Sequence, residues 1–279
     1  MIKSFLLTLV LGTLAVFSVS AQHSCCMTTP TAEFAVLAKD QSFTATHQNP
    51  LPYTHHSEVG KMIKIPTKGA EANAFELKAS SPSDKYLIVI HEWWGLNDHI
   101  KKEAEKYYSE LGNVHVLAID LYDGQVATTR EDAAKYMQGA SEERIREILK
   151  GVYNYVGHDA YIATIGWCFG GGWSLQAAML FGPNTVGCVM YYGMPEKDAE
   201  RAKMLQSDVL GIFASREKWI SPAVVSEFES MMQGIGKKVE IHQFDAEHAF
   251  ANPSNPAFDA KATAEAYTLS INYLKERLK

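Results

Sequence analysis

Between about residue 60 and the C-terminus, short apolar runs alternate with longer stretches of helical pattern. The run YLIVIHEW at 86–93 is almost continuously apolar, as expected for a strand buried on both faces. Helical patterns cover 98–111, 130–155, 221–234 and 258–278, and a further helix opens at Gly170. The other strand-like segments are KMIKIPT, AFELKAS, VHVLAID, YIATIGW, TVGCVMYYG, SDVLGIFAS and KKVEIHQF. This alternation predicts an α/β fold with a mainly parallel central sheet of about eight strands and helices on both faces.

The N-terminus has the pattern of a secretory signal. Residues 1–21 carry one cation at Lys3, an apolar core and small residues ending at Ala21. A transmembrane anchor is less favoured, because the apolar core is shorter than about 18–20 residues. The sequence QHSC likewise does not favour a lipid anchor on Cys25. We expect cleavage after Ala21, export to the periplasm or medium, an N-terminal extension over 22–57 and one large α/β domain over 58–279.

The charge balance limits the range of partners. The formal net charge is −6, and loss of the leader with its one lysine makes it one unit more negative. An acidic chain without a basic run is a poor match for nucleic acid or an anionic membrane surface. A small-molecule partner is therefore expected, with no membrane association after leader cleavage.

One of the four cysteines stands in unusual surroundings. Cys25 and Cys26 are adjacent in the polar N-terminal extension, and Cys188 lies in the apolar run VGCVMYY, as an inert core thiol would. Cys168 instead lies in GWCFGG, directly after the strand-like YIATIGW. A G-x-nucleophile-x-G turn between strand and helix is typical of an exposed nucleophile, here with cysteine in the usual serine position. The following helix N-terminus is expected to lower the pKa of the thiol.

A base and its orienting acid are predicted from their order along the chain. His248 follows the last strand, where a fold of this type places its histidine. Glu217, in the turn after the preceding strand, is the favoured acid; Asp208 precedes that strand, and Asp245 lies only three residues before His248. The histidines interpreted as structural are His23, His47, His99 and His242.

The segment HEWWGLND supplies further candidates. The turn after its strand provides an oxyanion-hole N–H in α/β-hydrolases, which predicts Trp93 and Phe169 as backbone donors. Glu92 lies beside them and could accept the Cys168 proton, whereas His91 is expected to pack behind it. Trp94 and Tyr192 predict an aromatic wall for the substrate.

These residues together resemble the dienelactone hydrolase family, carboxymethylenebutenolidase-like enzymes of the α/β-hydrolase fold. The shared stretches, from about Lys61 to the C-terminus, are HEWWGLND, IDLYDGQ, GWCFGG, YYG, GIFASREKWISP and HAFANPSNP. The resemblance implies that Cys168 is the nucleophile, His248 the base and Glu92 the group that helps generate thiolate when substrate enters. Glu217 stands where the family acid, usually Asp, is found.

Two positions depart from the family pattern. Members that act on dienelactone carry an arginine in each of two turns, and this chain has Gly124 and Asn252 there. Arg130 is near Gly124 in sequence and is a candidate substitute cation. We therefore expect a cysteine-dependent ester or lactone hydrolase that favours neutral or apolar substrates.

Two other functional classes are alternatives to this interpretation. One is a non-catalytic small-molecule-binding protein on a hydrolase scaffold, and the other is a redox role for the Cys168 thiol. The pair His55 and His56 could suggest a metal site, but histidines without partners of matching spacing are more often surface residues. No metal and no organic cofactor is expected.

Overall fold

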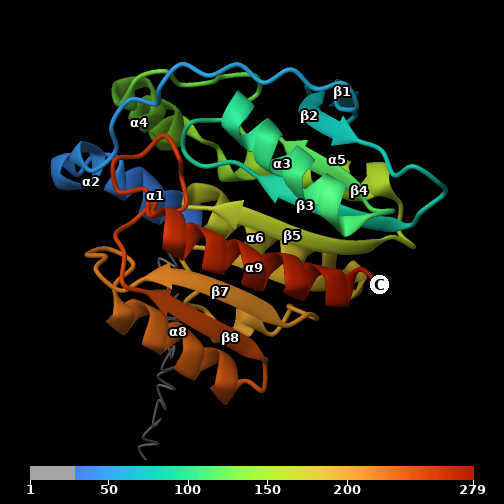
Figure 1. Cartoon of the computed structure of the whole chain (residues 1–279). Coiled ribbons are helices and arrows are strands. Elements are labelled where there is room, and N and C mark those ends of the chain that lie inside the picture. Colours follow the sequence, from blue (N-terminus) through green and yellow to red (C-terminus); the bar gives the residue numbers. More distant parts are fainter. Residues whose placement is uncertain (1–28) are drawn as a thin grey trace, which may run out of the picture.

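The computed structural model describes residues 29–279 (Figure 1). The predicted leader at 1–21, Cys25 and Cys26 lie outside the described residues. Within residues 29–279, no helix is both long enough and apolar enough to cross a membrane.

A central eight-stranded sheet confirms the predicted fold class. Its strand order is β1-β2-β4-β3-β5-β6-β7-β8, with β1 and β4 each antiparallel to β2 and all other neighbours parallel. The strands are β1 (Lys61–Ile65), β2 (Ala72–Leu77), β3 (Lys85–Ile90), β4 (His115–Ile119), β5 (Tyr161–Trp167), β6 (Thr185–Tyr191), β7 (Val209–Ala214) and β8 (Val239–Phe244).

Helices cover both faces of the sheet. The longer ones are α3 (Asp98–Leu111), α4 (Arg130–Gly139), α5 (Glu142–Val156), α6 (Phe169–Phe181), α8 (Pro222–Gly234) and α9 (Ala260–Arg277). The short ones are α1 (Pro30–Leu37), α2 (Gln41–Ala45), the 3₁₀ turn η1 (Gly182–Asn184) and α7 (Ala199–Ala202). Helices α3 and α9 pack together on one face, and α5 packs against α6 (Figure 1).

The parallel strands bring the turns that follow them to one edge of the sheet. The central strands β3, β5 and β6 are apolar and buried over most of their length, which fixes their register in the core. Because β5 lies between β3 and β6, the turns after these strands are neighbours, and those after β7 and β8 follow beside them. Helices α1 and α2 lie at this end of the molecule, with α1 packed on α4 and α6 (Figure 1).

Candidate active site

Cys168 lies on a sharp turn between β5 and α6. Its backbone has φ 54° and ψ −119°, a conformation that side chains rarely adopt. Two glycines make the turn possible. A Cβ at Gly166 would overlap the carbonyl oxygen of Gly170, and a Cβ at Gly170 would overlap the carbonyl oxygen of His91. The helix therefore starts directly against the strand and holds the thiol at the carboxyl edge of the sheet.

His248 and Glu217 form a buried pair beside this turn. His248 Nδ1 lies 2.8 Å from Glu217 Oε1, and the two side chains are 3% and 0% exposed. The backbone N–H of Ile220 donates to the same carboxylate oxygen at 3.3 Å, which holds it in place. The sequence alternatives lie elsewhere: Asp245 pairs with Arg216 at 2.8 Å on the surface.

Asp208, the other carboxylate weighed as the acid, binds the guanidinium of Arg277 through both of its oxygens. The position of Glu217 thus agrees with the expectation from chain order.

Cys168 and His248 interact directly. The pKa of the Cys168 thiol and that of the His248 imidazole both differ from their ordinary values. Burial raises the pKa of the Cys168 thiol, and this outweighs the opposing effect of His248. The prediction of a lowered thiol pKa is therefore wrong for the resting protein, because Cys168 is 1% exposed and desolvation exceeds the effect of the helix N-terminus. Burial disfavours the His248 cation, but its interactions with Glu217 and Cys168 raise its pKa well above the ordinary value.

Glu92 is the third ionisable group in contact with this centre. Burial raises the pKa of its carboxyl to about 7, although His248, Asn252 and Tyr192 act in the opposite direction. Asn252 Nδ2 donates to Glu92 Oε2 at 2.5 Å, and the Tyr192 hydroxyl donates to Oε1 at 3.3 Å. A carboxyl with a pKa near neutrality beside a neutral thiol is suited to accept its proton.

The two expected oxyanion donors lie in the turns after β3 and β5. Phe169 is the first residue of α6, so its N–H has no partner within the helix. This N–H lies close enough to Cys168 to lower the pKa of the thiol, against the larger effect of burial. Within residues 29–279, the N–H of Trp93 has no hydrogen-bond acceptor.

A pocket of about 150 Å³ reaches Glu92 from the surface. Among the predicted substrate contacts, Trp94 and Asn252 line it, whereas Tyr192 lies buried behind Glu92. The other lining residues are Tyr53, Asn97, His99, Ile100, Lys102, Glu103, Trp167, Ala251 and Pro253. The lining is thus divided equally between aromatic or apolar residues and polar or charged ones, so the pocket combines an apolar wall with several polar groups.

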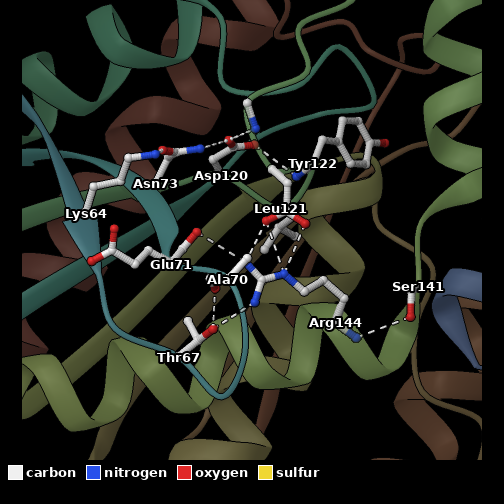
Figure 2. A network of polar contacts seen from close by, with 12 residues as sticks. Lys64, Thr67, Ala70, Glu71, Asn73, Asp120, Leu121, Tyr122, Ser141 and Arg144 are labelled. Carbon is white, nitrogen blue, oxygen red and sulfur yellow. Dashed lines mark hydrogen bonds and ion pairs between the residues drawn. The ribbon is translucent and has the colours of Figure 1, made fainter.

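Gly124 does not line this pocket. It lies in an exposed turn at φ +94°, and its N–H donates to Asp120 Oδ2. Figure 2 shows Asp120 between Asn73 and Tyr122. The Asp120 carboxylate also accepts hydrogen bonds from the Asn73 side-chain amide and the Tyr122 backbone N–H.

Arg144 lies beside the Gly124 turn and reaches across to Thr67 (Figure 2). Its guanidinium is paired with Asp123 at 2.6 Å. Arg130 is exposed and pairs with Glu131 at 3.2 Å. Neither arginine lines the pocket, so neither replaces the missing family arginine there.

The N-terminal extension covers the candidate site, which sequence reasoning missed. Phe34 on α1 packs edge-on against Phe169, and Phe43 on α2 contacts Trp93 and the His248 ring. His47, which follows α2, is 2% exposed and lies 5.4 Å from His248 between ring centres. The polar composition of 22–57 does not predict this packing. The available signal is the pair of phenylalanines, Phe34 and Phe43, in an otherwise polar segment.

The fold is that of an α/β-hydrolase, with Cys168 in the turn between β5 and α6 and the His248–Glu217 pair beside it. Residues 73–278 match the dienelactone hydrolase family, and the chain belongs to this family of hydrolases. It is 26% identical over 234 residues to a protein of Aquifex aeolicus (strain VF5) that is provisionally named a carboxymethylenebutenolidase; the match covers 79% of this chain and all of the relative.

Solved structures agree with the family in fold. A dienelactone hydrolase-like promiscuous phosphotriesterase from metagenomic libraries superposes with a TM-score of 0.68 at 20% identity, over 79% of this chain and 100% of that one. Dienelactone hydrolase from Anabaena variabilis ATCC 29413 gives a TM-score of 0.56 at 16% identity, over 79% and 98%. At these identities the likeness concerns the fold.

Proposed function

We propose that the protein hydrolyses a carboxylic ester or lactone through a thioester on Cys168. The observation that carries the proposal is the grouping of Cys168, held on a turn at φ 54°, with the buried pair His248 and Glu217. The provisional carboxymethylenebutenolidase name of the Aquifex aeolicus relative supports the substrate class.

The charges suggest an order of proton transfers. The Glu92 carboxylate takes the thiol proton, and the His248 imidazolium, balanced by Glu217, stabilises the thiolate. Sγ attacks the carbonyl carbon, while the N–H groups of Trp93 and Phe169 bind the oxyanion, worth about 3 kcal/mol each. The alcohol departs with the His248 proton and leaves a thioester.

Deacylation returns the site to its resting state. Neutral His248, oriented by Glu217, takes a proton from water, and the resulting hydroxide attacks the thioester carbonyl. The carbon–sulfur bond breaks, the acid leaves, and the thiolate regains its proton from Glu92. Every group in the cycle is then back in its starting form.

The experiment that tests the proposal is intact-protein mass spectrometry during incubation with a panel of esters and lactones. We expect an acyl adduct that maps to Cys168, appears before product and is absent in Cys168→Ala. Cys188, equally buried in the core, is the internal control and should stay unmodified. A bound ligand without adduct or product would instead support a non-catalytic binding protein.

We further propose that the protein acts after export, on the basis of the leader pattern at residues 1–21. N-terminal sequencing of the protein recovered from the producing cell tests this. A mature chain that begins at Gln22 supports export, and an intact Met1 or Ile2 terminus contradicts it.

A further inference from the structure

Three metal-ligating side chains meet above the α6 N-terminus. The donor atoms of His47, Cys168 and His248 all lie within 4.8 Å of one another, and all three residues are buried. The residues come from three distant parts of the chain: the N-terminal extension, the turn after β5 and the turn after β8. Hydrolysis as proposed above uses Cys168 and His248 but gives no task to His47.

The hydrogen bonds of His47 leave one ring nitrogen free. Nδ1 lies 2.9 Å from the carbonyl oxygen of Phe43, which can only accept, so Nδ1 carries the proton and Nε2 carries a lone pair. Within residues 29–279, this buried Nε2 has no hydrogen-bond partner. An unsatisfied buried acceptor is costly, and a metal ion would satisfy it.

The other two donors are arranged as metal ligands commonly are. Glu217 contacts His248 at Nδ1, and this leaves Nε2 as the ligating atom in a carboxylate–histidine pair. Cys168 supplies sulfur, the soft ligand that Zn²⁺ and related ions prefer. One thiolate and the Glu217 carboxylate together would balance the two charges of a divalent ion in this buried place.

The distances are compatible with such an ion. Zn–S bonds of about 2.3 Å and Zn–N bonds of about 2.0–2.1 Å put tetrahedral ligands roughly 3.3–3.6 Å apart. Donor atoms up to 4.8 Å apart therefore need to approach one another by at most about 1.5 Å. His47 lies beyond the short helix α2, in a segment attached to the domain by side-chain packing, so a movement of this size requires no change in the sheet.

We propose that His47, Cys168 and His248 form a binding site for one thiophilic divalent ion, with Zn²⁺ as its representative. Binding removes the proton from the Cys168 thiol, and that from His248 Nε2 when it is present, and both pass to solvent. The ion joins the N-terminal extension to the Cys168 turn. If hydrolysis proceeds as proposed, the metal-bound and acylated states of Cys168 exclude each other.

The test is a metal titration of the full chain after treatment with a chelator. We expect one equivalent of Zn²⁺ to bind in competition with a chromophoric chelator, and Co²⁺ to give a sulfur-to-cobalt charge-transfer band. His47→Gln should weaken Zn²⁺ binding at least tenfold and Cys168→Ser should abolish the cobalt band. The matched control is His242→Gln, which changes a partly exposed histidine paired with Glu240 and should leave the affinity unchanged.

Equal Zn²⁺ affinity in His47→Gln and wild type, or a Co²⁺ spectrum without the sulfur band, would overturn the proposal. Should His47→Gln prove unstable, alkylation of wild-type Cys168 gives an independent reading: Zn²⁺ must slow it at least tenfold, and an unchanged rate also overturns the proposal. All these readings are independent of ester turnover. Failure of the metal site therefore remains distinguishable from failure of the proposed hydrolysis.

Discussion

The backbone of Cys168, at φ 54° and ψ −119°, is in a region that glycine adopts readily and other residues rarely do. A residue in such a region costs about 1–3 kcal/mol, a cost that persists when function requires the side chain there. We expect Cys168→Ala and Cys168→Gly both to lose ester hydrolysis by at least about 10³-fold. Cys168→Gly should equal or exceed Cys168→Ala in the free energy of unfolding measured with urea, because glycine relieves the strain. At an unstrained position glycine would be the less stable by about 0.5–1 kcal/mol, and that order here would contradict the argument.

The proposed role of Glu217 as the orienting acid rests on its 2.8 Å contact with His248 Nδ1. Glu217→Gln should lower kcat by roughly 10²–10⁴-fold with little change in KM, since the amide removes the orienting charge but no substrate contact. Steady-state kinetics check this. Asp245→Asn is the control, because Asp245 is 85% exposed and paired with Arg216. A loss of activity in the control with no loss in Glu217→Gln would reverse the assignment.

Glu92 should set the acid limb of the pH profile. Its carboxyl has a pKa of about 7, so the base is ionised above that pH and is lost as the pH falls. We expect kcat/KM to fall about tenfold per pH unit below about pH 7. Asn252 donates to the carboxylate and lowers the pKa, so Asn252→Ala should move the limb to higher pH. A limb that stays in place in this variant would assign it to another group.

The same pKa has the opposite effect on stability. The folded state binds the Glu92 proton more tightly than the unfolded chain, so its contribution is fully present below about pH 4.5 and is lost as the pH rises through about 7. Glu92→Gln should therefore unfold with less pH dependence than wild type between these values, as measured by urea denaturation. A difference between the two proteins that does not change with pH would contradict the shifted pKa.

For single residues, the sequence predicted where the candidate site residues lie better than it predicted their ionisation states. Cys168, His248, Glu217 and Glu92 each follow a strand, and parallel strands bring such residues to one edge. The thiol pKa depends on how deeply the turn is buried, which is decided by residues far away in the sequence. His47 could not be recognised for the same reason.

At the scale of elements, the strands were predictable and helices α1 and α2 were not. A continuous apolar run such as that of β3 carries its own signal, since it is buried on both faces. Helix α1 has almost no apolar stripe, α2 has only five residues, and both begin at side-chain N-caps, Thr29 and Asp40. Their position depends on contacts with residues far away in the sequence, among them the Trp219 Nε1 hydrogen bond to Asp40 at 3.2 Å.

Phe43 is the main contact between this N-terminal cover and the site, because its ring meets Trp93, Trp219 and His248. Phe43→Ala should cost about 3–5 kcal/mol locally and raise the rate at which a thiol reagent modifies Cys168 by at least tenfold. Val36→Ala is the control on α1, because Val36 is 66% exposed and its loss should change stability by less than about 0.5 kcal/mol. Equal Cys168 reactivity in wild type and Phe43→Ala would show that α2 does not restrict access.

At the scale of the whole molecule, charge and pocket composition together bear on substrate choice. The formal net charge is −6. The residues that line the pocket include two carboxyl groups, Glu92 and Glu103, and one ammonium group, Lys102. Where family members that act on dienelactone have an arginine, Asn252 instead holds Glu92. Composition predicted the sign of the net charge, but only the structure separates Asn252, which lines the pocket, from Gly124, which does not.

We therefore expect a higher kcat/KM for a neutral ester than for an anionic ester with the same acyl group. Hydrogen bonds to charged groups are worth about 1.5–3 kcal/mol, so Asn252→Arg should improve the anionic substrate about 10- to 100-fold relative to the neutral one. Gly124→Arg is the matched control: the new side chain lies outside the pocket, and it should leave selectivity unchanged despite the strain at φ +94°. The comparison is made at two salt concentrations, because repulsion by the net charge weakens as salt rises whereas a direct contact persists. A preference of the unmodified enzyme for the anionic ester at both concentrations would refute this, and Lys102 would then be the cation to substitute first.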